Sequence, residues 1–116
     1  MKKIIPFEVL IEAVMSKFLE KPTQTNLILR KQYACSRHKR EFTGKGFFVD
    51  FILPSDISKV QNHLDLHANG KINNNIDVGF ILFIKNGILD CLEGFTYYGE
   101  WPEKIMNCEL FYEKYN

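Results

Sequence analysis

The stretch that decides the fold is VGFILFIKNGILDCLEGFTYYGEWPE, residues 78–103. An apolar run at 78–85 leads into Asn86-Gly87, and a second strand-like run follows at 88–97. Asn-Gly between two such runs predicts a two-residue β-hairpin turn, because both residues tolerate the positive φ angles that this turn requires. Three apolar residues of the second run are expected to pack in the structure: Leu89, Leu92 and Phe95.

A second hairpin is predicted upstream, from residues 33–42 and 46–53. The TGKG segment between them (43–46) is typical of a turn, since glycine adopts positive φ at little cost. Alternation in the second strand predicts two faces, with Phe47, Val49, Phe51 and Leu53 on one and Phe48, Asp50 and Ile52 on the other.

The clearest helix is predicted at residues 4–21, where apolar residues recur at the helical spacing and Pro22 ends the run. Its apolar stripe is wide and aromatic, so we expect it to cover a flat surface such as a sheet.

Residues 23–32 are compatible with two structures. Thr23 or Thr25 would cap a short second helix with Leu27 and Ile28 on its inner side, whereas NLILR would begin a strand. The short helix is the favoured interpretation.

Residues 54–77 are a polar connection between the hairpins. One or two helical turns are expected in SDISKVQNHL (55–64), and ANGKINNN (68–75) has the composition of a loop. The predicted fold is therefore α+β: one or two N-terminal helices packed on a four-stranded antiparallel sheet, in a single domain over residues 1–116.

One layer of helices covers only one face of such a sheet. The other face would expose Phe48, Ile52, Ile81 and Phe83. Two interpretations stay open: the tail at 102–116 folds over this face through Ile105, Met106, Leu110 and Phe111, or the face binds a second copy of the chain or another protein.

Composition places the chain among cytoplasmic globular proteins. It has 116 residues, 46% of them hydrophobic and 25% charged, which is enough for one core. Glu8 and Glu12 interrupt the N-terminal apolar run, so neither a signal peptide nor membrane association is expected. The three cysteines, Cys35, Cys91 and Cys108, are predicted to be reduced thiols.

Charge is unevenly distributed although the net charge is only +1. Residues 21–46 carry seven basic side chains and one acidic one, and residues 86–116 carry six acidic and two basic ones. The two segments are expected either to neutralise each other or to form separate patches. RKQYACSRHKR (30–40) mixes basic and aromatic residues as nucleic-acid surfaces do, but no recognition motif accompanies it, and nucleic acid is not the expected partner.

No cofactor, metal site or enzymatic activity is predicted from the motifs. His63 and His67 have helical metal-ligand spacing but lack a third ligand nearby. Cys35 and His38 would lie on opposite faces of a strand, where a thiolate–imidazole pair cannot form. Glu93 and Glu100 could form an acid–base pair, with Glu93 on the face of Leu89 and Cys91, yet nothing else indicates a sugar site.

Two blocks, REFTGKGFFVDFILP (40–54) and residues 78–103, resemble a group of small bacterial proteins. These have a short helical start and hairpins of the form GFF-DF-P and GF-LF--NG-L--LEG-TYG-E-WP, and they are similar to cytosolic immunity proteins, the antidotes encoded beside bacterial toxins. The likeness covers about a third of the chain. It implies helices followed by an antiparallel sheet, and a toxin domain as partner. It implies no catalytic residues. The near-neutral charge departs from the acidic character of antidotes to basic nucleases.

The end of the quoted stretch combines aromatic side chains with carboxylates, as interface hot spots do. The residues predicted to bind a partner are Glu93, Tyr97, Tyr98, Glu100, Trp101 and Glu103. Trp101 has a second interpretation, as a cap on the end of the core. The expected function is non-enzymatic binding of a protein, as an immunity protein or, alternatively, as a homodimeric module. A ligand-binding or enzymatic site centred on Glu93 is the remaining alternative.

Overall fold

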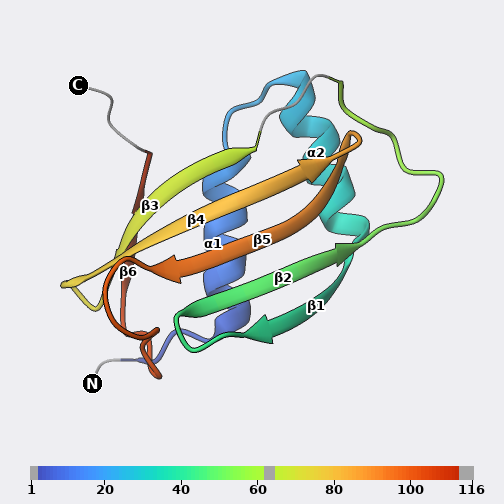
Figure 1. Cartoon of the computed structure of the whole chain (residues 1–116). Helices are drawn as coiled ribbons and strands as arrows, with labels where there is room; N and C mark the ends of the chain where they lie inside the picture. The colour runs from blue at the N-terminus through green and yellow to red at the C-terminus, as the bar shows by residue number, and fades with distance from the viewer. Residues whose placement is uncertain (1–2, 62–64, 113–116) are drawn as a thin grey trace.

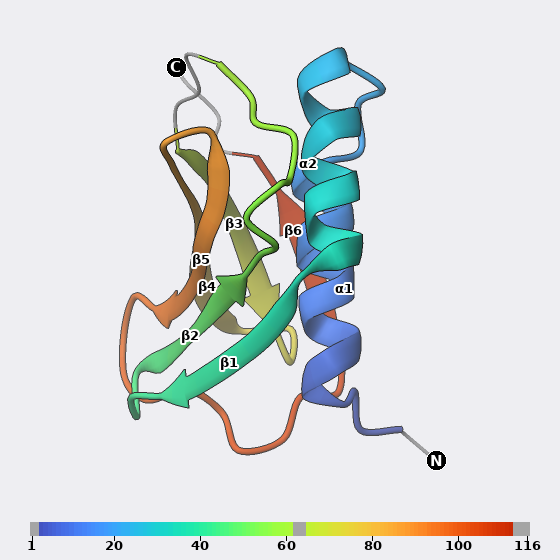
Figure 2. The same cartoon turned by 90° about the vertical axis from the view of Figure 1, so that its right-hand side faces the viewer.

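Over residues 3–61 and 65–112, which the computed structural model describes, six antiparallel strands form one sheet and two helices cover one of its faces (Figure 1). The helices are α1 (Phe7–Phe18) and α2 (Gln24–Cys35), and the strands are β1 (Arg37–Phe42), β2 (Gly46–Ile52), β3 (Leu66–Ile72), β4 (Ile76–Lys85), β5 (Ile88–Thr96) and β6 (Cys108–Phe111). Their order across the sheet is β1-β2-β5-β4-β3-β6. Figure 2 shows the helical layer and the sheet edge-on.

The core lies between these two layers. α1 buries its apolar stripe, which includes Leu10, Val14 and Phe18, against the inner side chains of the central strands. In β2 the predicted alternation is confirmed, because Phe47, Val49 and Phe51 are buried, whereas Asp50 and Ile52 are exposed and Phe48 is half-buried. The wide apolar stripe of α1 thus packs on the flat surface of the sheet, as predicted from its width.

The α+β class and the antiparallel sheet are confirmed, but the predicted number of four strands is wrong. The loop expected at 68–75 is largely β3, which pairs with β4 along its whole length. Its inner positions are Ala68, Gly70 and Ile72, so small and polar residues conceal the alternation. The turn that follows places Asn73 and Asn74 at φ 54° and 69°, a conformation that asparagine tolerates better than most residues. β6, in the predicted tail, adds the sixth strand beside β3.

The second helix is confirmed and is longer than expected. Thr23 accepts a hydrogen bond from the Asn26 backbone N–H as the N-cap, and the helix continues to Cys35. Its buried side chains are Leu29 and Gln32, whereas Leu27, predicted on the inner side, is exposed.

Several boundaries also differ from the prediction. α1 is shorter than residues 4–21, and β1 begins at Arg37 because residues 33–35 belong to α2. Cys35 is exposed at the end of α2, so its predicted place in a strand is wrong. Residues 55–61 form no helical turn, and the rest of that predicted segment lies outside the described residues.

The Asn-Gly hairpin is confirmed. Asn86 and Gly87 have φ angles of 54° and 81°, and they join β4 to β5. A β-bulge then shifts the register between Phe83 and Ile84. A bulge inserts one extra residue, so the alternation of faces along β5 changes at this point. Leu89 is buried on the inner face, whereas Glu93 pairs with Ile81 on the outer face. The prediction that Glu93 shares a face with Leu89 is therefore wrong.

As far as Tyr112, the last residue that the structure describes, the C-terminal segment does not cover the outer face of the sheet, so the interpretation that Ile105, Met106, Leu110 and Phe111 fold over this face is wrong. Ile105 belongs to the core and its carbonyl accepts a hydrogen bond from the Ile5 N–H, which ties the segment to the start of α1. β6 contacts α1 and pairs with the sheet only at its β3 edge. The described part of the chain contains no helix of the length and hydrophobicity that crossing a membrane requires.

Candidate protein-binding surface

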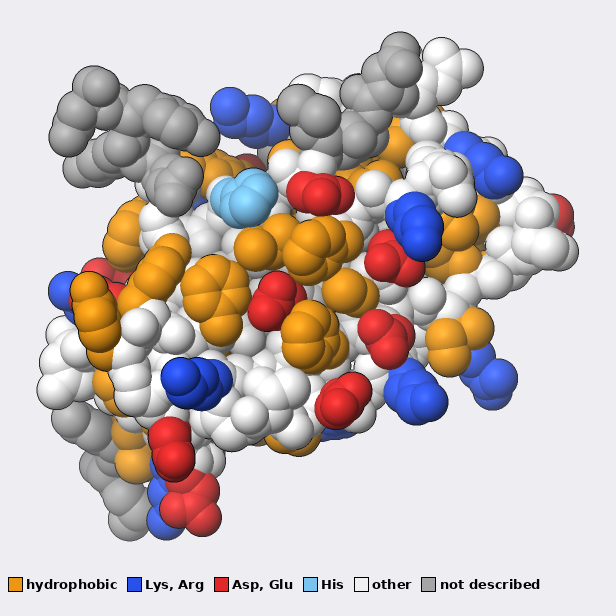
Figure 3. Space-filling view, in the orientation of Figure 1, with side chains coloured by type: hydrophobic (Ala, Val, Ile, Leu, Met, Phe, Trp, Pro, Cys, Tyr) orange, Lys and Arg blue, Asp and Glu red, His pale blue; other side chains and the backbone are white. Residues whose placement is uncertain are grey.

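The outer face of the sheet carries half-buried apolar side chains from three neighbouring strands. Figure 3 shows them gathered over the middle of the sheet, with acidic side chains set among them. We define the outer patch by its apolar members Phe48, Ile81, Phe83, Cys91 and Phe95 and its carboxylates Asp50, Asp65, Asp90 and Glu93.

The strand register brings the members of the outer patch together. Glu93 on β5 pairs with Phe48 of β2 on one side and with Ile81 of β4 on the other. Two residues before it, Cys91 pairs with Asp50 and with Phe83 in the same way. Directly paired residues on one face have Cβ atoms about 5 Å apart, so the central carboxylate lies between two apolar side chains.

Phe95 of β5 and Tyr97, the residue after the end of this strand, extend this face. Their rings meet edge to face, with centroids 5.4 Å apart. Both lie over Gly79, where an added Cβ would be 2.5 Å from Phe95 Cζ and 2.9 Å from the Tyr97 hydroxyl oxygen. The Tyr97 hydroxyl donates to Asn69 Oδ1 on β3, which holds the ring across the sheet.

Four carboxylates influence the thiol at the centre of the outer patch. Burial raises the pKa of Cys91 to about 11, and the nearby Asp90, Asp50, Glu93 and Asp65 raise it in the same direction. The thiol is therefore protonated at neutral pH, and the charge of the patch is carried by the carboxylates.

The six residues predicted to bind a partner do not form one site. Glu93 belongs to the outer patch and Tyr97 lies at its end, whereas the Tyr98 side chain is 85% exposed beyond the strand. The other three, Glu100, Trp101 and Glu103, line a separate groove of about 400 Å³ with the exposed Ile4 and Phe42.

Trp101 packs as a cap on the core as well as lining this groove. Its ring meets Phe47 and Phe80 edge to face, with centroid distances of 5.2 and 6.3 Å. Its backbone N–H donates to the Gly44 carbonyl at 2.8 Å, which fixes the segment against the β1–β2 turn. These contacts match the second interpretation of Trp101.

The basic strand β1 does not lie beside the acidic strand β5, because β2 separates them. β1 is an edge strand and pairs only with β2, where Lys39 faces Asp50. Its Arg40 forms an ion pair with Glu8 of α1. The carboxylates of the outer patch therefore lie in the middle of the sheet, with Arg37 and Lys39 at its β1 edge and Lys71 on β3 paired with Asp77.

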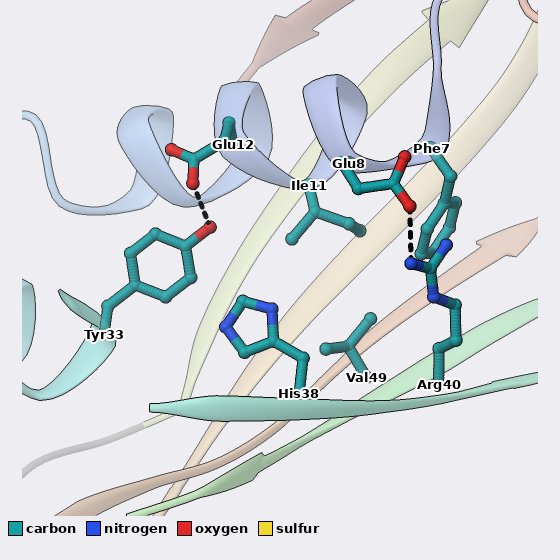
Figure 4. A pocket seen from close by; sticks show the side chains of 8 residues that line it. All are labelled: Phe7, Glu8, Ile11, Glu12, Tyr33, His38, Arg40 and Val49. Atoms are coloured by element: carbon teal, nitrogen blue, oxygen red, sulfur yellow. Dashed lines mark hydrogen bonds and ion pairs between the residues drawn. The ribbon is translucent and has the colours of Figure 1, made fainter. Parts of the chain in front are cut away.

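A second cluster of chemically active groups lies on the helical side, and the sequence motifs did not indicate it. α1, α2, β1 and β2 together enclose a cleft of about 240 Å³ (Figure 4). We call it the His38 cleft; its lining residues are Phe7, Glu8, Ile11, Glu12, Tyr33, His38, Arg40 and Val49. The i, i+4 spacing of Glu8 and Glu12 on one helix face was the available signal, but their partners come from another helix and a strand.

Metal binding finds no support in these arrangements. Within residues 3–61 and 65–112, no three His, Cys, Asp or Glu side chains converge as a metal site requires. His67 is exposed on β3, and His63 lies outside the described residues.

No protein-family model, curated protein or solved structure matches the chain. Its fold class is that of an α+β protein with two helices on one face of a six-stranded antiparallel sheet.

Proposed function

We propose that this chain is a non-enzymatic protein-binding domain that docks a basic surface of another protein on its outer patch. The observation that carries the proposal is an apolar patch in the middle of a sheet face that neither the helices nor the C-terminal segment up to Tyr112 cover. Apolar patches of this kind mark interaction sites more often than chance, because leaving them in water is unfavourable.

The composition of the outer patch supports a protein partner. Phe48, Phe83 and Phe95 are large, stiff side chains, and aromatic residues are enriched where interfaces gain most of their energy. Asp50, Asp65, Asp90 and Glu93 add negative charge around them. A partner with lysine or arginine around an apolar centre would complement both features and would be steered to the patch by charge.

A binding role also fits the state of the one nucleophile in the patch. Nucleophilic catalysis requires Cys91 as a thiolate, but burial and the surrounding carboxylates raise the pKa of its thiol to about 11. The same carboxylates that would attract a basic partner thus suppress the reactivity of the thiol.

The specific form of the proposal is a cytoplasmic immunity protein that neutralises a bacterial toxin domain by occluding it. It rests on the resemblance of residues 40–54 and 78–103 to such proteins, and these blocks supply most of β2, β4 and β5, the strands that build the outer patch. Tight inhibition would bury roughly 1,200–2,000 Å² in total, so the contact would extend beyond the patch.

A second copy of the chain is the alternative occupant. The β1 edge of the same face carries Arg37 and Lys39, so an offset two-fold arrangement could place these residues of one copy against the acidic centre of the other. A directly stacked dimer would instead bring the central carboxylates together, which is unfavourable.

The test is affinity capture of the tagged protein expressed from its own locus, followed by mass spectrometry. Ile81→Asp and Glu93→Lys alter the outer patch, and Glu20→Lys, at an exposed position in the connection between α1 and α2, is the matched charge control. We expect one partner that the unaltered chain and Glu20→Lys retain and that both patch variants lose.

Two other results would contradict the proposed surface. Retention of the partner by both patch variants, with loss on reversing Glu100 and Glu103, would place binding at the groove beside Trp101. Recovery of the bait alone, with twice the monomer mass in light scattering, would establish the homodimer instead.

A further inference from the structure

The His38 cleft lies on the opposite side of the sheet from the outer patch, so its role is independent of the proposed function. Its floor is apolar, with buried Ile11 and Val49, and polar groups surround the opening. Figure 4 shows Glu8 and Glu12 reaching down from α1 toward side chains from α2 and β1. At about 240 Å³ the cleft is smaller than most drug-sized sites and would hold a ligand of only a few heavy atoms.

The hydrogen bonds of Ser36 determine the tautomer of His38. The Ser36 hydroxyl donates its only hydrogen to the Tyr33 carbonyl, at 2.7 Å. Toward His38 Nε2, 3.0 Å away, the same hydroxyl can only accept, so the neutral ring carries its proton on Nε2. The Nδ1 atom is then an acceptor, and Figure 4 shows a ring nitrogen directed into the cleft.

Packing keeps the imidazole in place and neutral. Its ring stacks on Tyr33 at a centroid distance of 5.4 Å and meets the Phe51 ring edge to face at 5.2 Å. Desolvation lowers the pKa of His38, Arg40 acts in the same direction, and Glu12 opposes both. The ring therefore offers a lone pair at neutral pH.

The two carboxylates of the cleft are held in different ways. Glu8 is neutralised by Arg40, whose guanidinium also lies over the Phe7 ring at 5.0 Å. Glu12 accepts a hydrogen bond from the Tyr33 hydroxyl at 2.8 Å, but a hydroxyl carries no charge. Among the residues that line the cleft, the Glu12 carboxylate therefore has no cationic partner. Its two oxygens can accept more hydrogen bonds than the one from the Tyr33 hydroxyl.

We infer that the His38 cleft binds an organic cation, an ammonium or guanidinium group on a short aliphatic stem. The cationic group would pair with Glu12 and donate an N–H to His38 Nδ1, and the stem would lie on Ile11 and Val49. An anion would meet an unneutralised carboxylate and a lone pair, and a neutral amide would leave the charge of Glu12 uncompensated.

The test is a titration of the full chain followed by NMR of the backbone amides and the imidazole nitrogens. The probes are butylguanidinium, neutral butyramide and anionic butyrate, which share a short alkyl stem. We expect only butylguanidinium to shift the Glu12 amide and the His38 ring nitrogens in a saturable way. The free ring should already show the Nε2–H tautomer.

Substitution of Glu12 provides the decisive comparison. Glu12→Gln keeps an acceptor for the Tyr33 hydroxyl but removes the charge, and should weaken butylguanidinium binding at least about tenfold. Glu20→Gln, two residues after the end of the same helix and outside the cleft, should not change it. Equal shifts from butyramide, or unchanged binding in Glu12→Gln, would overturn the inference.

The dependence on pH is a second readout. Glu8, Glu12, Tyr33 and Arg40 face His38 from the elements around it. Protonation of the ring removes the Nδ1 lone pair and adds a positive charge, so binding should decrease as the pH falls through the pKa of His38. A constant affinity across that range would exclude the imidazole from the site.

The same cation can arrive free or as an arginine side chain, and a further probe distinguishes these sources. N-acetyl-Gly-Arg-Gly-amide carries the guanidinium on a peptide. Binding as tight as that of butylguanidinium would indicate an arginine of a partner protein, whereas exclusion of the peptide would indicate a free small molecule.

Discussion

The buried side chain of Gln32 bonds the backbone N–H of Leu89, with Oε1 accepting at 2.9 Å. Its Nε2 donates to the Ser58 carbonyl at 2.8 Å and to the Gly87 carbonyl at 3.0 Å. The Gln32 side-chain amide on α2 thus links two loops, the connection that follows β2 and the β4–β5 turn. On the other strand at the bulge, Asp65 Oδ1 accepts a hydrogen bond from the Ile84 N–H at 3.0 Å. Side chains thus accept from the backbone N–H groups of Leu89 and Ile84, where the pairing of β4 with β5 is irregular.

The first prediction concerns this amide. Gln32→Leu retains the apolar volume but leaves the buried Leu89 N–H without its acceptor, and should lower the free energy of unfolding by about 2–3 kcal/mol. Urea denaturation measures the change. Gln24→Leu, at an exposed position of the same helix, should stay within about 0.5 kcal/mol. If the two substitutions change the free energy of unfolding equally, the hydrogen bonds of Gln32 do not stabilise the fold.

The second prediction separates stability from binding at Glu93. A carboxylate between Phe48 and Ile81 is a poor cross-strand neighbour, so Glu93→Val should raise the free energy of unfolding by about 0.2–1 kcal/mol. The same variant should lose affinity for the captured partner. Urea denaturation and the capture assay on one preparation measure both. A destabilised variant would mean that Glu93 stabilises the fold, and unchanged capture would mean that it does not contact the partner.

The third prediction distinguishes the contributions of Trp101 and Tyr98, two aromatic residues after β5, to stability. Trp101→Ala removes edge-to-face contacts with Phe47 and Phe80 and should cost about 2–4 kcal/mol of unfolding free energy, because the ring is half-buried. Tyr98→Ala, at a side chain exposed to solvent, should cost at most about 0.5 kcal/mol. Thermal unfolding of both variants distinguishes them. A stable Trp101→Ala protein that no longer binds its partner would show that Trp101 serves the interface.

The fourth prediction concerns the thiols. Burial raises the pKa of both Cys91 and Cys108 to about 11, with smaller contributions from neighbouring carboxylates. At pH 8 roughly one in a thousand of each would be thiolate, so the exposed Cys35 should react with a disulfide reagent well before them. Mass spectrometry of the labelled peptides checks the order, and Cys35→Ser should remove the fast phase. Rapid labelling of Cys91 in the folded chain would contradict its protonated state.

The same thiols give stability a defined pH dependence. A thiol whose pKa is higher in the folded state than in the unfolded one stabilises the fold while it is protonated. This contribution is complete below the ordinary thiol pKa, about 9, and is lost as pH rises toward about 11. Cys91→Ser and Cys108→Ser should each reduce the loss of stability over this range.

Local chemistry made the β4–β5 hairpin predictable. Asn86 and Gly87 specify the turn through their own backbone preferences, and Thr23 specifies the start of α2 through a bond to a residue three positions away. The uncovered apolar face was also predictable, since Phe48, Ile81 and Phe83 alternate with buried neighbours along their strands. Each of these signals lies within a few residues of sequence.

The features that local sequence patterns do not reveal depend on contacts with distant segments of the chain. β3 carries few apolar residues and is a strand because β4 and β6 pair with it. The bulge that separates Leu89 from Glu93 is supported by Gln32 and Asp65, which lie far away in the chain.

The sequence by itself thus determined the class of fold, its two hairpins and the apolar outer face, because turn chemistry and alternation act locally. Only the tertiary structure decided which residues lie beside Glu93, that the tail up to Tyr112 leaves the outer face open, and that Glu12, Tyr33 and His38 form one cleft. These three arrangements join residues of different helices and strands, and their geometry follows from packing across the layers, which no local pattern encodes.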